Sequence, residues 1–163
     1  MKKLLLITGA RNSGKTALVL RAAAEIGDSG GVCSPAEISC GEKMRYFVRS
    51  LRSGRELPLL RRTAAGPRIN AAGFKFANSV IRRNARRKVL FVDEYGPLEE
   101  RGGGFYAALL SACVVDSGAL VLAVRKSLLE SASSRLQFNR YKMLDLDSMG
   151  QEKALKCLLK FVA

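Results

Sequence analysis

Runs of consecutive apolar residues recur along the chain, and stretches with helical periodicity separate them. The segments Lys3–Thr8, Lys88–Asp93 and Ala119–Val124 are apolar at nearly every interior position, which predicts β-strands buried on both sides. Shorter strands are expected at 30–35 and 140–144. Helices are expected over Lys15–Ile26, Asn70–Arg83, Phe105–Val115, Ser127–Leu136 and Ser148–Phe161, the last with Asp147 as its cap. This alternation predicts an α/β fold of three layers, in which helices cover both faces of a mainly parallel sheet.

The central region departs from this plan. Residues 43–51 alternate between apolar and basic side chains, as in a half-buried strand, and Ser53-Gly54 is a turn signal. Residues 56–60 can pair back on the strand formed by residues 43–51. We therefore expect a basic β-hairpin at about 43–62, inserted into a single domain that spans 1–163.

Charge is concentrated in the same region. The chain of 163 residues has a formal net charge of +14. Residues 43–88 contain fourteen basic residues and one acid, Glu56, and so carry thirteen of those charges. Such a field attracts polyanions. The 43–88 segment is open to three interpretations: contact with nucleic acid, attraction of a nucleotide substrate, or solubility alone.

Composition excludes several kinds of site. The chain has no histidine, and its four cysteines form no C-x-x-C pair. Cys/His zinc sites and Ser-His or Cys-His catalytic groups are therefore excluded, and a general base must come from another side chain such as a carboxylate or lysine. The apolar start is too short for a signal peptide or a membrane span. We expect a cytoplasmic protein, without membrane contact and monomeric.

The first apolar strand leads into a glycine-rich loop that matches G-x-x-x-x-G-K-[ST]. Its backbone N–H groups, together with the start of the following helix, form an anion-binding nest for phosphates. Lys15 is expected to reach the β- and γ-phosphates, and the Thr16 hydroxyl to ligate Mg²⁺. The predicted nucleotide-binding residues are Gly9, Ala10, Arg11, Asn12, Ser13, Gly14, Lys15, Thr16 and Ala17.

A second motif, KVLFVDEYGPLEE, ends the second long strand with two acids. Residues at the carboxyl ends of parallel strands face the ligand crevice. Asp93 is therefore the expected second metal ligand, holding the Mg²⁺ bound by Thr16 through water. Glu94 is the expected general base, taking a proton from a water that attacks the γ-phosphate.

Two arginines are candidates for stabilising charge in a transition state. Arg11 lies within the phosphate loop and could act as an internal arginine finger, or it could point into solvent. Arg125 follows the third long strand, beside Lys126. Either member of this pair could face the γ-phosphate, or the pair could simply be solvated.

These motifs resemble those of the small nucleoside-triphosphatases of the thermophile-enzyme type, a family also known as cancer-related nucleoside triphosphatases. The resemblance rests on GARNSGKT, GGVCSPAE (30–37) and VDEYGPLEE (92–100), in that order. It implies a P-loop fold of the RecA/AAA-like strand order, with an added strand between the loop strand and the Asp-Glu strand. It also implies Mg²⁺-dependent hydrolysis of ATP, GTP and other nucleoside triphosphates to diphosphate and phosphate. Glu37 matches a family glutamate to which we assign no role.

Two alternatives to hydrolysis share the phosphate loop. A small-molecule or nucleotide kinase would need an acceptor pocket and an arginine-bearing lid, for which residues 45–68 are a candidate. An ATP-dependent nucleic-acid-binding module would use the basic 43–88 segment. Few aromatic residues accompany those arginines, so stacking of single strands is expected to be weak. The aromatic candidates are Tyr46, Phe47, Phe74 and Phe76.

Overall fold

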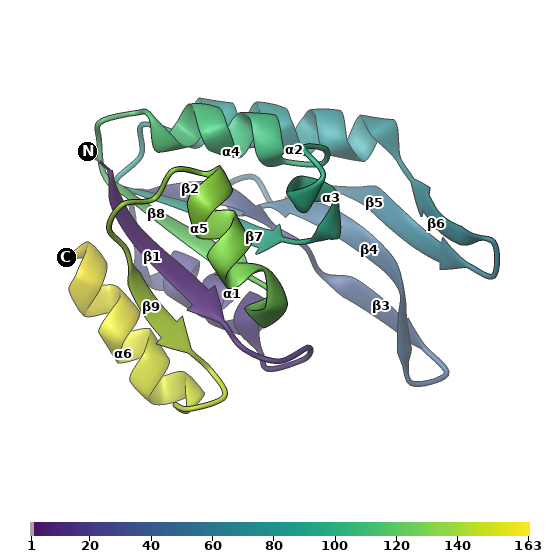
Figure 1. Cartoon of the computed structure of the whole chain (residues 1–163), viewed down its shortest axis with the longest axis horizontal. Coiled ribbons are helices and arrows are strands. Elements are labelled where there is room, and N and C mark those ends of the chain that lie inside the picture. Colours follow the sequence, from purple (N-terminus) through teal and green to yellow (C-terminus); the bar gives the residue numbers. More distant parts are fainter. Residues whose placement is uncertain (1) are drawn as a thin grey trace.

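The computed structural model describes residues 2–163 and contains, within them, one nine-stranded sheet with helices on both faces (Figure 1). Five strands form its parallel core, in the spatial order β2-β7-β8-β1-β9. Their bounds are β1 Lys3–Thr8, β2 Ser29–Cys33, β7 Val89–Tyr95, β8 Ala119–Val124 and β9 Lys142–Asp145. The helices are α1 Lys15–Glu25, α2 Ala71–Asn84, α3 Pro97–Glu100, α4 Tyr106–Cys113, α5 Leu129–Arg135 and α6 Gln151–Val162. The expected α/β class is confirmed.

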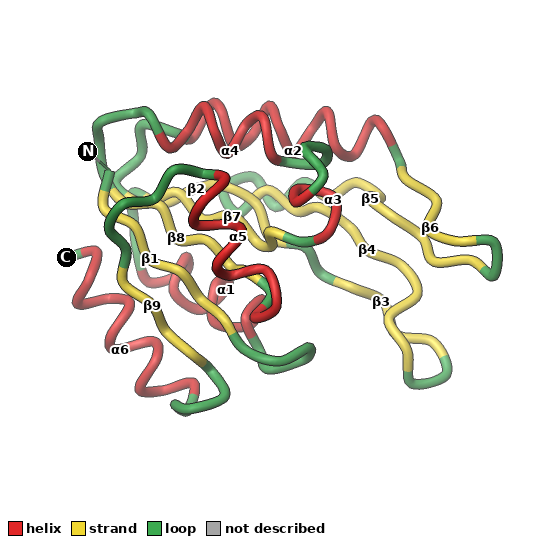
Figure 2. The backbone as a smooth tube through the Cα atoms, in the orientation of Figure 1, coloured by secondary structure: helices red, strands yellow, loops and turns green. Residues whose placement is uncertain are grey.

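The long apolar strands supply two separate hydrophobic cores. In β1, Leu4 and Leu6 join the core beneath α2, α4 and α5, whereas Leu5 and Ile7 join the core beneath α1 and α6. Successive side chains of a strand point to opposite faces, so a strand covered on both sides must be apolar at every position. The three layers follow from this arrangement, and Figure 2 shows the sheet between its helices.

Strand β8 lies between the phosphate-loop strand β1 and the Asp-Glu strand β7. Val121 pairs with Leu5 on one side and with Phe91 on the other. This is the RecA/AAA-like order that the resemblance implies. Because the three strands are parallel, the residues after β1, β7 and β8 come together at one edge of the sheet.

The expected hairpin is present but forms part of a larger unit. β4 (Glu42–Ser50) and β5 (Glu56–Thr63) pair antiparallel, and two short strands that the sequence did not reveal flank them. These are β3 (Ala36–Ser39) and β6 (Gly66–Ile69). β4 also pairs with β2, so the unit continues the main sheet at one edge (Figure 1). We call β3–β6 the antiparallel extension. The insertion is therefore wider than the expected 43–62. The sequence did not reveal β3 and β6 because both strands are too short and too exposed to show a burial pattern.

The structure corrects two of the expected helix boundaries. Asn70 caps α2 by accepting a hydrogen bond from the Gly73 N–H at 3.0 Å. Asp147, expected to cap the last helix, does not do so, because α6 begins at Gln151 after Gly150. The segment expected as one helix over 127–136 divides into a 3₁₀ turn, Lys126–Leu128, and α5. Of the helices in residues 2–163, none has both the length and the apolar character to cross a membrane.

Candidate functional site

The phosphate loop adopts a conformation that requires its two fixed glycines. Gly9 and Gly14 have φ angles of 148° and 92°, where side chains are strained. A Cβ atom on Gly9 would lie 2.6 Å from Ser13 Oγ, and one on Gly14 would lie 2.3 Å from Gln151 Nε2. The helix α1 begins directly after Gly14, so its first N–H groups face the loop.

Lys15 is held inside the loop. Its side chain is buried, and Nζ donates hydrogen bonds to the Gly9 and Ala10 carbonyl oxygens at 3.2 and 3.0 Å. A third contact joins Nζ to Ser13 Oγ at 3.4 Å. The ammonium group therefore lies within the loop, where it could contact a bound anion. Its present hydrogen-bond acceptors are neutral oxygens, and the charged oxygens of a phosphate could replace them.

A cavity of about 630 Å³ lies beside this loop, and every predicted site residue lines it. All nine residues from Gly9 to Ala17 line it, together with Asp93, Glu94 and Arg125. Residues far apart in the sequence thus meet at one sheet edge. The cavity also has lining residues that the sequence did not single out for this site, namely Ser34, Ile38, Lys43, Tyr46 and Ser127.

Thr16 and Asp93 are in direct contact. Thr16 Oγ1 donates to Asp93 Oδ2 at 2.7 Å, and the Ser34 N–H donates to the same oxygen at 3.2 Å. Ser34 Oγ in turn donates to the Asp93 carbonyl oxygen at 2.6 Å. Burial raises the pKa of Asp93 to about 6; the Thr16 hydroxyl opposes that shift and the nearby Glu94 adds to it.

The hydroxyl and carboxylate oxygens of this pair suit a hard cation such as Mg²⁺. Among residues 2–163, no three His, Cys, Asp or Glu side chains are grouped to hold a metal by themselves. A cation here would therefore complete its shell with water and phosphate oxygens, which is how Mg²⁺ is usually bound in such sites.

Glu94 and Arg125 form an ion pair in the same cavity. Arg125 Nε donates to Glu94 Oε1 at 2.9 Å, and both side chains remain partly exposed. The expected base is therefore within the site, and its neighbour is the arginine proposed for charge stabilisation. Arg11 also lines the cavity, but it is exposed to solvent, and no carboxylate in residues 2–163 forms an ion pair with it.

Asp147 contacts the phosphate loop, a role that sequence reasoning missed. Its carboxylate accepts the Ala10 N–H, with oxygens at 2.9 and 3.0 Å, although Asp147 does not itself line the cavity. Lys126 Nζ donates to Asp147 at 3.1 Å and to Asp145 at 2.9 Å. Gln151 Nε2 donates to the Gly14 carbonyl oxygen at 3.1 Å. These contacts tie the end of β9 and the start of α6 to the phosphate loop.

Two glutamates of the sequence motifs, Glu99 and Glu37, do not line the phosphate cavity. Glu99 is buried and accepts the Gly96 and Phe105 N–H groups at 3.0 and 2.9 Å, so it fixes the turn after β7. Glu37 lies opposite Arg45 across β3 and β4, with an ion pair at 3.7 Å.

Comparison with known proteins identifies the family and the fold. The model of a family described as NTPase matches residues 4–156. The nucleoside-triphosphatase THEP1 of Methanopyrus kandleri is 26% identical over 133 residues, which cover 76% of this chain and 74% of that protein.

Two solved structures share the fold. The crystal structure of THEP1 from Aquifex aeolicus has a TM-score of 0.78 at 15% identity and covers 98% of both chains. The solution structure of a human cancer-related nucleoside triphosphatase has a TM-score of 0.78 at 18% identity, and the match covers 98% of this chain and 97% of that one. With the family model spanning most of its length, the chain belongs to the NTPase family, and with it to the nucleoside-triphosphate hydrolases.

Proposed function

We propose that this protein is a Mg²⁺-dependent nucleoside-triphosphatase that hydrolyses ATP, GTP and other nucleoside triphosphates to the diphosphate and phosphate. The observation that carries the proposal is the contact between Thr16 Oγ1 and Asp93 Oδ2 at 2.7 Å, with Glu94 lining the same cavity. This contact joins the two motifs, seventy-seven residues apart, at one site.

The phosphate loop would bind and orient the triphosphate. Its N–H groups and Lys15 would hold the β- and γ-phosphate oxygens, exchanging the carbonyl contacts of Lys15 for charged ones. Thr16 and Asp93 would hold Mg²⁺, which when bound neutralises charge on the phosphates and keeps them aligned. Burial of Asp93 favours this role, because a cation relieves the cost of its buried charge.

Glu94 would act as the general base for the attacking water. It is the cavity carboxylate that neither Thr16 nor the loop engages, and its partner is Arg125. A γ-phosphate entering the cavity offers Arg125 a second anion. The guanidinium would then lie between the carboxylate and the phosphate, where it can stabilise developing charge.

Loose base preference fits the rest of the cavity. Beyond the loop, its wall comes from Ile38, Lys43 and Tyr46 of the antiparallel extension. Apolar and aromatic surfaces contact any base through its face, whereas discrimination needs groups that hydrogen-bond a base edge. We expect similar turnover with several nucleobases.

A phosphate-release assay tests hydrolysis against phosphoryl transfer. The purified protein is incubated with γ-labelled ATP and Mg²⁺, with and without nucleosides and nucleotides as acceptors. Hydrolysis predicts that the label appears in free phosphate without any acceptor. Label on an acceptor instead would favour the kinase alternative, and no release from any triphosphate would refute the proposal.

A further inference from the structure

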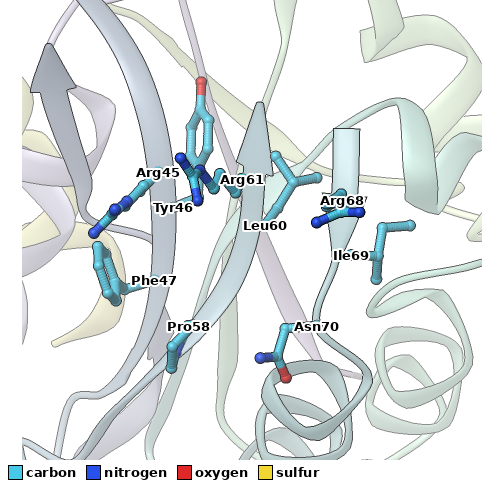
Figure 3. Close-up of a pocket in the computed structure, with 9 residues that line it drawn as sticks. All are labelled: Arg45, Tyr46, Phe47, Pro58, Leu60, Arg61, Arg68, Ile69 and Asn70. Atoms are coloured by element: carbon cyan, nitrogen blue, oxygen red, sulfur yellow. The ribbon is translucent and has the colours of Figure 1, made fainter. Parts of the chain in front are cut away.

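The antiparallel extension carries a row of three arginines. Arg45 of β4 pairs in register with Arg61 of β5, and Arg61 pairs with Arg68 of β6. Residues directly opposite each other in antiparallel strands project from the same face of the sheet. Figure 3 shows the three side chains in order across these strands, lining a cavity of about 330 Å³.

This row is electrostatically unfavourable in the protein alone. Like charges that stand directly opposite on neighbouring strands destabilise a sheet. Glu37 continues the row on β3 and lies 3.7 Å from Arg45, but both side chains are more than half exposed. Within residues 2–163, no carboxylate lies within ion-pair distance of Arg61 or Arg68. An anion bound along the row would remove this repulsion.

The same face offers an aromatic surface. Phe47 lies two residues after Arg45 and pairs with Pro58 of β5, so both project beside the arginines. The opposite face is the buried one, where Val48 and Leu59 join the core beneath α2. Phe47 is partly exposed and lines the cavity. A partly exposed ring next to basic side chains is the arrangement on which unpaired bases stack.

The surroundings of this cavity add to its positive potential. Asn70, which caps α2, lines it, and the first turn of α2 contains no acid, so the positive end of the helix dipole lies nearby. Tyr46 lines this cavity and the phosphate cavity, so occupants of the two would be neighbours.

We propose that this face binds a single-stranded polynucleotide, with Arg45, Arg61 and Arg68 on its phosphates and Phe47 against a base. A single strand fits better than a duplex because only its bases are free to lie on the Phe47 ring. A hollow lined by charged side chains, with its aromatic ring partly buried, fits a strand better than a membrane surface. The proposal goes beyond nucleotide hydrolysis and does not depend on it.

The test compares two variants of equal net charge. One carries Arg45→Gln, Arg61→Gln and Arg68→Gln. The control carries Arg82→Gln, Arg83→Gln and Arg86→Gln, three exposed arginines in the last turn of α2 and just after it, about 20 Å along the helix axis from its first residue. Fluorescence anisotropy with a labelled oligouridylate is recorded against KCl concentration, without nucleotide. Circular dichroism and thermal unfolding confirm that both variants fold.

Three phosphate contacts on a single strand contribute about −2 to the slope of log affinity against log salt. We expect the first variant to lose that contribution and to bind at least tenfold more weakly at low salt, while the control keeps the slope. Phe47→Leu should weaken single-strand binding about tenfold without changing the slope. The proposal is wrong if the parent protein does not bind the oligonucleotide, or if both triple variants lose the same amount of oligonucleotide affinity. It is also wrong if a duplex of the same sequence binds as tightly as the single strand, or if the protein binds phosphatidylserine vesicles but not the oligonucleotide.

Discussion

Arg125 Nε lies 2.9 Å from Glu94 Oε1, so the end of β8 supplies the direct partner of the carboxylate at the end of β7. If Arg125 stabilises transition-state charge, Arg125→Ala should lower kcat by about 10²-fold, the usual loss when one such donor is removed. KM should change much less, because the loop and Lys15 supply most ground-state binding. Steady-state phosphate release measures both constants. Arg11→Ala is the comparison, and an unchanged kcat for Arg125→Ala would remove this role.

Glu94→Gln should stop turnover while leaving nucleotide affinity nearly intact. The amide keeps the shape and can still accept from Arg125, but it cannot take a proton from water, and loss of a general base typically costs 10²–10⁴-fold. Phosphate release gives the rate, and titration with a fluorescent nucleotide gives the affinity. Hydrolysis at the parental rate would show that another group activates the water.

Asp93→Asn should stabilise the nucleotide-free protein at high pH. Burial raises the pKa of Asp93 to about 6, above its value in the unfolded chain, so the folded state holds the proton more tightly. The cost of ionising Asp93 in the folded state therefore grows as pH rises from about 4 to about 6, and it reaches roughly 3 kcal/mol above that range.

The amide can still accept from Thr16 and from the Ser34 N–H, so only the charge is lost. Thermal unfolding of parent and variant, in buffers from pH 4 to pH 8 without Mg²⁺, should show a Tm difference that increases with pH. Equal Tm values at pH 8 would contradict the pKa shift. The variant should also lose Mg²⁺-dependent turnover.

Asp147→Asn should tighten nucleotide binding several-fold at low salt. The Asp147 carboxylate accepts the Ala10 N–H and lies close enough to Lys15 to interact with its charge, so it would repel a phosphate bound at Lys15. The amide keeps an acceptor and removes the repulsion. Isothermal titration at two salt concentrations checks this, because the gain should shrink as salt screens the charge. Weaker binding in the variant would mean that the carboxylate chiefly holds the loop in shape.

The pattern of apolar residues along the chain predicts the main strands, and the fixed glycines predict the loop of the candidate site. Continuous apolar runs predict β1, β7 and β8 because a strand covered on both faces is apolar throughout. The phosphate loop is recognisable because backbone geometry demands glycine at positions 9 and 14. β3 and β6 lack such a signal, since they are short, exposed and stabilised mainly by pairing with their neighbours.

Tertiary structure alone decided which distant residues meet. The partners of Glu94, of the Ala10 N–H and of Glu37 are Arg125, Asp147 and Arg45, and no local pattern relates them. Each contact depends on strand order or register, which long-range burial determines. The sequence by itself predicted a phosphate-binding loop after β1 and determined that two acids end β7. The position of β8 between β1 and β7, which no local pattern shows and only the family resemblance implied, comes from packing of the whole sheet. The register that aligns three arginines on β4, β5 and β6 has the same origin.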